Sequence, residues 1–129
     1  MNYLCIVYGE DGPNTMTPAE ETALKDGLIE EDHAQFLAGN VLMASPLQGR
    51  ETAVSIRYPN GVRTITDGPF AETKEYVAGF IVISANNMDE AIKIAVEGEF
   101  EGFGNFEIRP LLDEKHSKTG QDRSFFFKR

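Results

Sequence analysis

The chain has 129 residues, a length typical of one domain that can bury a core without metal or disulfide staples. It carries 21 acidic and 12 basic side chains, which gives a formal net charge of −9 at pH 7. This balance disfavours non-specific binding to nucleic acid and to anionic membrane surfaces, so a small molecule or a protein is the expected partner.

The N-terminal part predicts a strand and then a long helix. Residues 3–8 are apolar on both alternating faces, as in a strand that is covered on two sides. Thr17-Pro18-Ala19-Glu20 combines an N-cap, a proline at the first helical position and a capping-box glutamate, which predicts a helix from about Pro18 to Ala38. Its apolar residues occupy a broad arc: Leu24, Leu28, Ile29, Phe36 and Leu37.

The middle of the chain predicts a short strand at residues 41–46 and then a β-hairpin. Asn60-Gly61 between two alternating runs is a strong signal for a two-residue hairpin loop. The resulting register pairs Tyr58 with Arg63, Ile56 with Ile65, and Val54 with Asp67, all on one face. Asp67 is therefore expected at the end of an apolar face, where a carboxylate needs a partner or a polar pocket.

The remaining elements are a strand over residues 75–85, a helix that begins near Met88, and a last strand over residues 106–111. Helices that cover one side of an antiparallel sheet indicate an α+β sandwich of ferredoxin-like type, here with an inserted β-hairpin. Because both faces of the first strand are apolar, we expect a second copy to cover the other side, in a homodimer packed sheet to sheet. Phe125-Phe126-Phe127 is expected to add an edge strand or to lie across the partner.

The composition also indicates the cellular compartment of the protein and whether it needs a metal or a cofactor. Cys5 is the single cysteine and lies in an apolar run, which indicates a small buried hydrophobe in a reduced compartment. There is no span of about 18 apolar residues and no signal-peptide pattern, so we expect a cytoplasmic protein. The two histidines lack a spaced set of carboxylates, and no phosphate-binding or dinucleotide-binding glycine motif occurs, so no metal and no cofactor are expected.

Residues 67–75, Asp-Gly-Pro-Phe-Ala-Glu-Thr-Lys-Glu, combine backbone constraint with four charged side chains. We call them the signature segment. Asp67 could act as a general base or orient a substrate hydroxyl; the alternative is that it caps the following turn. Lys74 could bind a substrate carboxylate, although pairing with Glu72 or Asp67 is the favoured interpretation.

Other candidates lie on the first helix and the hairpin. His33 stands four residues from Ile29 and from Leu37, which places an ionisable group beside the apolar arc, and Asp32 is placed in the same way. Histidine suits proton transfer, but a partly buried polar residue is the plainer interpretation. Tyr58 and Arg63 could clamp an anion, or serve packing alone.

Residues 66–75 resemble the signature of the DGPF-domain, YCII-related family. The first strand, Gly79-Phe80 and residues 107–111 support the resemblance, which covers about residues 1–112 and leaves 113–129 as a polar and aromatic tail. The resemblance implies a dimeric ferredoxin-like α/β-barrel. It brings no known reaction, although the family is regarded as enzymatic, with a His–Asp pair proposed as its acid–base centre. Asp67 matches the signature carboxylate, whereas His33 lies only six residues before Gly39, closer to the helix end than the family's helical histidine.

The sequence therefore predicts a homodimer that binds a small organic molecule and has acid–base activity. Its site is expected in a cleft between sheet and helices, lined by Asp67, Phe70 and first-helix residues. The alternatives are a non-catalytic regulatory or protein-interaction module, and a signature segment that is purely structural. Asp67 and His33 are the catalytic candidates. The ligand-binding candidates are Asp32, Tyr58, Arg63, Phe70 and Lys74.

Overall fold

The computed structural model describes residues 1–97 and 104–128. Its helices and strands, in chain order, are β1 (Asn2–Glu10), α1 (Pro18–Leu37), β2 (Val41–Pro46), β3 (Val54–Arg57), β4 (Thr64–Asp67), β5 (Glu75–Ser84), α2 (Met88–Val96) and β6 (Asn105–Pro110). Three short 3-10 turns accompany them: η1 (Arg50–Thr52), η2 (Pro59–Gly61) and η3 (Ser124–Phe127).

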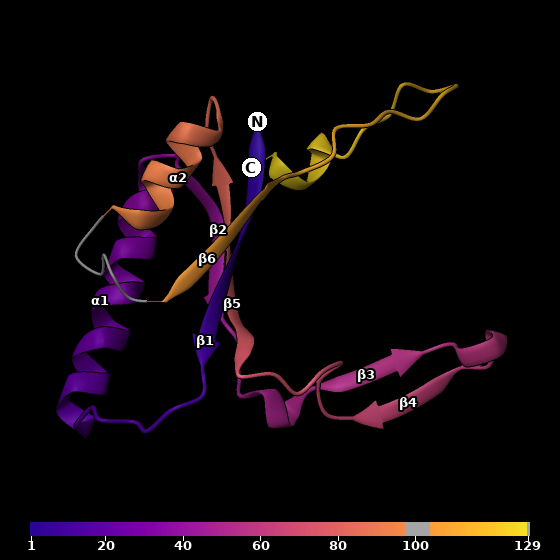
Figure 1. Cartoon of the computed structure of the whole chain (residues 1–129). Coiled ribbons are helices and arrows are strands. Elements are labelled where there is room, and N and C mark those ends of the chain that lie inside the picture. Colours follow the sequence, from indigo (N-terminus) through magenta and orange to yellow (C-terminus); the bar gives the residue numbers. More distant parts are fainter. Residues whose placement is uncertain (98–103, 129) are drawn as a thin grey trace.

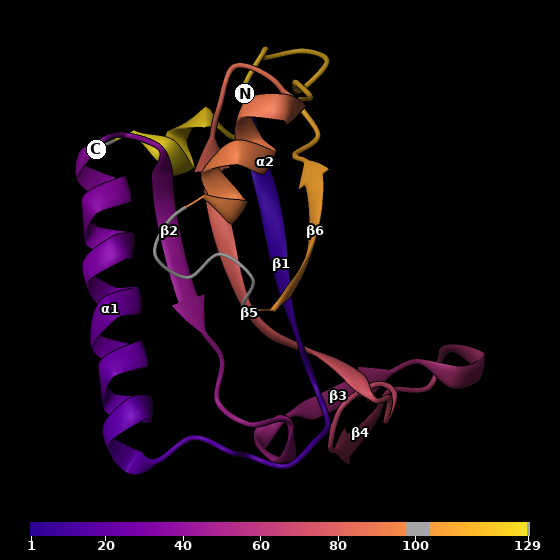
Figure 2. The ribbon, with the colours of Figure 1, turned by 60° about the vertical axis from the view of Figure 1, so that its left-hand side comes forward.

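The main sheet has the order β2-β5-β1-β6, and all of its neighbouring strands are antiparallel. Both helices lie on the same side of this sheet (Figures 1 and 2). Strands β3 and β4 form a separate hairpin between β2 and β5. With that hairpin set aside, the order is β-α-β-β-α-β, so the mixed α+β fold is compatible with the ferredoxin-like sandwich expected from the sequence.

The helices begin where their caps predict. Thr17 Oγ1 accepts a hydrogen bond from the Glu20 amide at 3.1 Å, and Glu20 Oε1 accepts one from the Thr17 amide at 3.1 Å. This capping box satisfies two amides that the helix itself leaves unpaired. At the other end Gly39 adopts φ 81°, a conformation that favours glycine and ends α1.

The core lies between α2 and the sheet. Its buried members are Tyr3, Cys5, Ile83, Ala85 and Ala91. Cys5 has no exposed surface, and burial raises the pKa of its thiol to about 11. The cysteine is therefore the small buried hydrophobe that its apolar run predicts.

Helix α1 departs from expectation because none of its residues is buried. Ile29 and Leu37, two members of the predicted apolar arc, are 61% and 71% exposed. The arc is too wide for one contact face, and polar groups occupy part of the inward side. There Gln35 donates to Glu31 Oε1 at 3.1 Å and accepts from Asn40 at 2.9 Å.

The face of the sheet away from the helices is apolar and open. Leu4 pairs with Val82 and Ile6 pairs with Phe80 on this face, whereas Tyr3 and Cys5 point to the helices. All four open-face side chains are only half-buried. The hairpin and the C-terminal tail both project on this side (Figure 1).

The tail does not add a strand to the sheet. Phe125 to Phe127 fall in η3, which corrects the edge-strand prediction, and Phe126 is exposed. The tail is joined to the sheet where the Leu111 amide donates to the Asn2 carbonyl at 2.9 Å.

Among the described residues, neither helix combines the length and the apolar character needed to cross a membrane.

Replacing Ile83 with alanine should lower the free energy of unfolding by about 2 to 5 kcal/mol, because a fully buried side chain is lost and its cavity cannot collapse completely. Urea unfolding followed by circular dichroism measures this loss. Ile92→Ala is the matched control, since Ile92 is 44% exposed and should lose much less. Equal losses in the two variants would contradict the placement of the core.

Candidate functional site

The hairpin has the register that the sequence predicts. Val54 pairs with Asp67 and Ile56 pairs with Ile65. Asn60 and Gly61 both adopt positive φ, at 53° and 77°, as a type I′ loop requires. The paired ladder ends with Arg57 and Thr64, so the predicted pair of Tyr58 and Arg63 lies just beyond it.

The signature segment folds back over the polar face of the hairpin. The Gly68 amide donates to the Ala53 carbonyl at 2.8 Å, and the Ser55 hydroxyl donates to the Gly68 carbonyl at 2.7 Å. Gly68 has φ 103°, which a residue with a side chain rarely adopts. This arrangement buries Ser55. The two hydrogen bonds of Gly68 therefore fix the direction of the backbone after Asp67.

Phe70 is engaged by the same face of the hairpin. The Arg57 guanidinium donates to the Phe70 carbonyl and stacks over its ring, 4.1 Å from the ring centroid. The ring itself remains exposed. Phe70 therefore packs on Arg57.

A second arginine fixes the far end of the signature segment. Arg50 donates to the Thr73 carbonyl at 2.7 Å, forms an ion pair with Asp11, and lies 4.6 Å from the centroid of the Tyr76 ring. The hydrogen bond and the charge of Arg50 lower the pKa of the Asp11 carboxyl. The Asp11 amide also donates to the Lys74 carbonyl at 2.8 Å, so the loop after β1 is tied to the segment twice.

Asp67 itself is exposed, and its side chain makes no hydrogen bond or ion pair with any described residue. The turn cap considered for it does not form. Lys74 likewise makes no ion pair with Glu72 or Asp67. The backbone of the signature segment is thus held by its neighbours, while these two charged side chains are available to other molecules.

The first-helix candidates differ from each other. Asp32 is half-buried, and desolvation together with the charge of Glu31 raises the pKa of its carboxyl. His33 is exposed, on the side of α1 that carries Ile29 and Leu37. The position of His33 beside the apolar arc had suggested a partly buried side chain. In the structure the side chain is exposed and does not pack against the sheet.

The described residues of one chain do not form the expected cleft between the signature segment and the first helix. In Figures 1 and 2, α1 lies on the helix side of the sheet and the hairpin extends from the opposite side. Asp67, Tyr58, Arg63 and Phe70 therefore do not meet Asp32 or His33. The residues of a hairpin loop predict which residues pair across the hairpin. They do not predict the direction in which the hairpin leaves the sheet.

The structure has two notable surface pockets, and neither contains a candidate residue. One, of about 450 Å3, lies between α2 and β6. The other, of about 230 Å3, has a polar lining. Its residues come from the end of α1 and from α2: Gln35, Asn40, Glu90, Lys93, Ile94 and Glu97. Within the described ranges, no group of three or more histidine, cysteine or acidic residues is placed to hold a metal ion.

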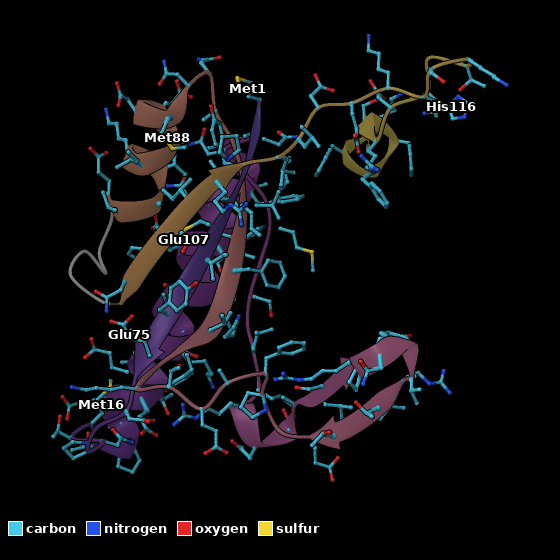
Figure 3. All side chains as sticks on the ribbon, turned by 45° about the vertical axis from the view of Figure 1, so that its right-hand side comes forward. Met1, Met16, Glu75, Met88, Glu107 and His116 are labelled. Atoms are coloured by element: carbon cyan, nitrogen blue, oxygen red, sulfur yellow. The ribbon has the colours of Figure 1, made fainter. Side chains whose placement is uncertain are left out.

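Histidine 116 has a structural role of its own. Its Nδ1 accepts hydrogen bonds from the amides of Lys118 and Thr119, both at 3.2 Å. Figure 3 shows His116 in the tail, well away from Glu75 at the start of β5. It stabilises the turn of the tail and stands apart from the signature segment.

The three residues that organise this region, Arg50, Asp11 and Tyr76, were not found from the sequence. Asp11 and Arg50 are 39 positions apart, and nothing in either local pattern indicates their pairing. Tyr76 lies in a run of β-forming residues, where an aromatic side chain is ordinary. Long-range pairs of this kind follow from the fold and have no local sequence signal.

Comparison with known proteins gives one family. The family model described as the YCII-related domain matches residues 1–115. An uncharacterized protein of Rhizobium meliloti (strain 1021) is 28% identical over 116 residues, which covers 86% of this chain and 92% of that protein. The family match includes the whole main sheet, the hairpin and the signature segment.

Replacing Ser55 with alanine should lower the free energy of unfolding by about 1 kcal/mol, because the Gly68 carbonyl loses its buried hydroxyl donor. Urea denaturation provides the measurement. Ser84→Ala removes the same atom from a serine whose hydroxyl makes no hydrogen bond with a described residue, and it should cost less. A loss at Ser55 no larger than that at Ser84 would show that this bond does not hold the segment.

Proposed function

Because the chain belongs to the YCII-related family, we propose that it is a homodimer that binds a small organic molecule beside Asp67 and uses this carboxylate in acid–base chemistry. The observation that supports this most directly is the contrast within the signature segment. Its backbone is fastened by Ser55, Arg57 and Arg50, whereas the Asp67 carboxylate is left without a partner among the described residues.

Such an arrangement suits a binding group. A side chain that acts on a ligand needs a rigid support, and the hydrogen bonds to Gly68, Phe70 and Thr73 provide one on either side of the segment's turn. An exposed, ionised carboxylate accepts hydrogen bonds from a ligand hydroxyl and can take up a proton. The capping role that would make Asp67 purely structural is not observed.

The homodimer supplies what one chain lacks. The open sheet face presents Leu4, Ile6, Phe80 and Val82 with only partial cover, and a second such face is the natural partner for it. In a sheet-to-sheet dimer the hairpin, which leaves on this side, extends toward the second copy. Asp67 then stands at the boundary between copies, where the second copy can provide the walls of the site.

A second candidate function is a non-catalytic interaction module. The exposed row of Ile29 and Leu37 on α1 favours it, because these side chains lie on the outer side of the helix and away from the open sheet face. A partner protein docked there would use the dimer as a scaffold. Stoichiometric co-purification of another protein, lost in Ile29→Glu, would support this function over the first.

The wild-type chain should have a solution mass of twice 14.3 kDa by light scattering. Ile6→Glu places a carboxylate at the centre of the proposed interface and should yield monomers, since the charge would be buried without a partner. Ile29→Glu makes the same change on the outer side of α1 and should remain dimeric. Dimeric Ile6→Glu would exclude packing through the open face.

Asp67→Asn should abolish ligand binding while leaving the fold and the dimer in place. A panel of small hydroxy acids, amino acids and carbonyl compounds, tested by thermal shift, provides the probe. Glu72→Gln removes an exposed carboxylate from the same segment and serves as the control. A compound that stabilises Asp67→Asn as much as wild type would contradict the role of Asp67.

A further inference from the structure

The two faces of the β3–β4 hairpin are used very differently. Ser55 and Arg57 on the polar face are engaged by Gly68 and Phe70 of the signature segment. The other face carries Val54, Ile56, Tyr58 and Ile65, whose side chains are between 49% and 64% exposed. The described part of the chain therefore contacts the polar face, where it buries Ser55, and leaves the apolar face to water.

This exposure is costly for the hairpin. A two-stranded hairpin alone in water is at best marginally stable, and it gains stability when its apolar face packs on something else. The hairpin projects away from the sheet, and the tail lies at the opposite end of the molecule in Figures 1 and 2. An occupant from outside the described residues would therefore stabilise the hairpin by covering its apolar face.

The charges at the ends of the apolar face indicate which occupant fits. Asp67 stands at the base of the hairpin, opposite Val54, and Arg63 stands at the tip, beyond the last strand pair. Strand alternation places both on the face of Ile65, about 13 Å apart at roughly 3.3 Å per residue. The face thus has a negative end, an apolar centre and a positive end.

Such a surface is complementary to itself. If two copies of the hairpin pack face to face in opposite directions, a two-fold axis passes near Ile65, and the negative end of each meets the positive end of the other. The apolar centres then cover each other. The two charge pairs form together by symmetry.

We propose that the hairpins of two copies pack through their apolar faces, so that Arg63 of the second copy pairs with Asp67 and each copy completes the signature site of the other. This rests on the homodimer proposed above and gives its site a second residue. The guanidinium orients the Asp67 carboxylate and leaves acceptor positions on it for a ligand hydroxyl.

Charge reversal tests the pairing directly. Arg63→Asp and Asp67→Arg each create two repulsive pairs in their own homodimer, so sedimentation analysis should show the dimer dissociation constant rising about tenfold or more in each. In a one-to-one mixture of the two variants, every pair is attractive again. Native mass spectrometry with one tagged variant should therefore show heterodimer well above the half expected for random exchange.

Glu72→Arg provides the matched control, because it makes the same charge change in the signature segment but outside the hairpin, and its dimer should be unaffected. The double variant Arg63→Asp/Asp67→Arg should recover most of the wild-type affinity. A random heterodimer fraction, or unchanged affinity in the single variants, would overturn the proposed pairing. So would equal weakening by Glu72→Arg.

Circular dichroism melts confirm that each variant folds. If a reversed variant does not fold, the neutral pair Arg63→Gln and Asp67→Asn is measured instead: the double change should weaken the dimer no more than either single one, and additive effects would overturn the pairing. A wild-type chain that stays monomeric would refute the homodimer and the pairing together. The charge-reversal experiment measures only the association of the two copies. If it shows no pairing in a chain that is still dimeric, the proposed ligand binding at Asp67 is not contradicted.

Discussion

The Arg50 guanidinium joins three segments that are distant in the sequence. It pairs with Asp11 after β1, donates to the Thr73 carbonyl in the signature segment, and lies over the Tyr76 ring at the start of β5. An arginine suits this position because its planar fork can serve several acceptors at once while one face stacks on an aromatic ring. The direction of the signature segment, and with it the placement of the hairpin, depends on this contact.

The signature segment contains backbone groups that the fold uses and a charged side chain, Asp67, that the described residues leave without a partner. Its carbonyl groups and its glycine are used by the fold, since Ser55, Arg57 and Arg50 each take one of those carbonyls. The Asp67 carboxylate is the part that the fold does not use. The turn itself needs the backbone conformation of Gly68 but not the Asp67 carboxylate, so a substitution of Asp67 alone can test a functional role without disturbing the turn.

Local physical chemistry made much of the fold predictable. The capping box of Thr17 and Glu20 located the start of α1, and Asn60-Gly61 set the register that pairs Val54 with Asp67. The packing of α1 was not predictable in this way, because its apolar arc covers more than one side of the helix. The expected meeting of Asp67 with the first helix was wrong for a related reason: Asp67 and His33 were each placed on their own element, but nothing local indicated that those elements lie on opposite sides of the sheet.

The inserted position of the hairpin has a consequence for how the chain folds. Its pairs join residues close in the sequence, such as Arg57 and Thr64, whereas the central strand β1 pairs with β6 from the far end of the chain, as in Tyr3 with Pro110. Local contacts of the first kind form in microseconds, and contacts of the second kind require closing nearly the whole chain. During synthesis the hairpin is therefore expected to form transiently before the sheet can close, so its apolar face is exposed to water while the rest of the molecule is still unfinished.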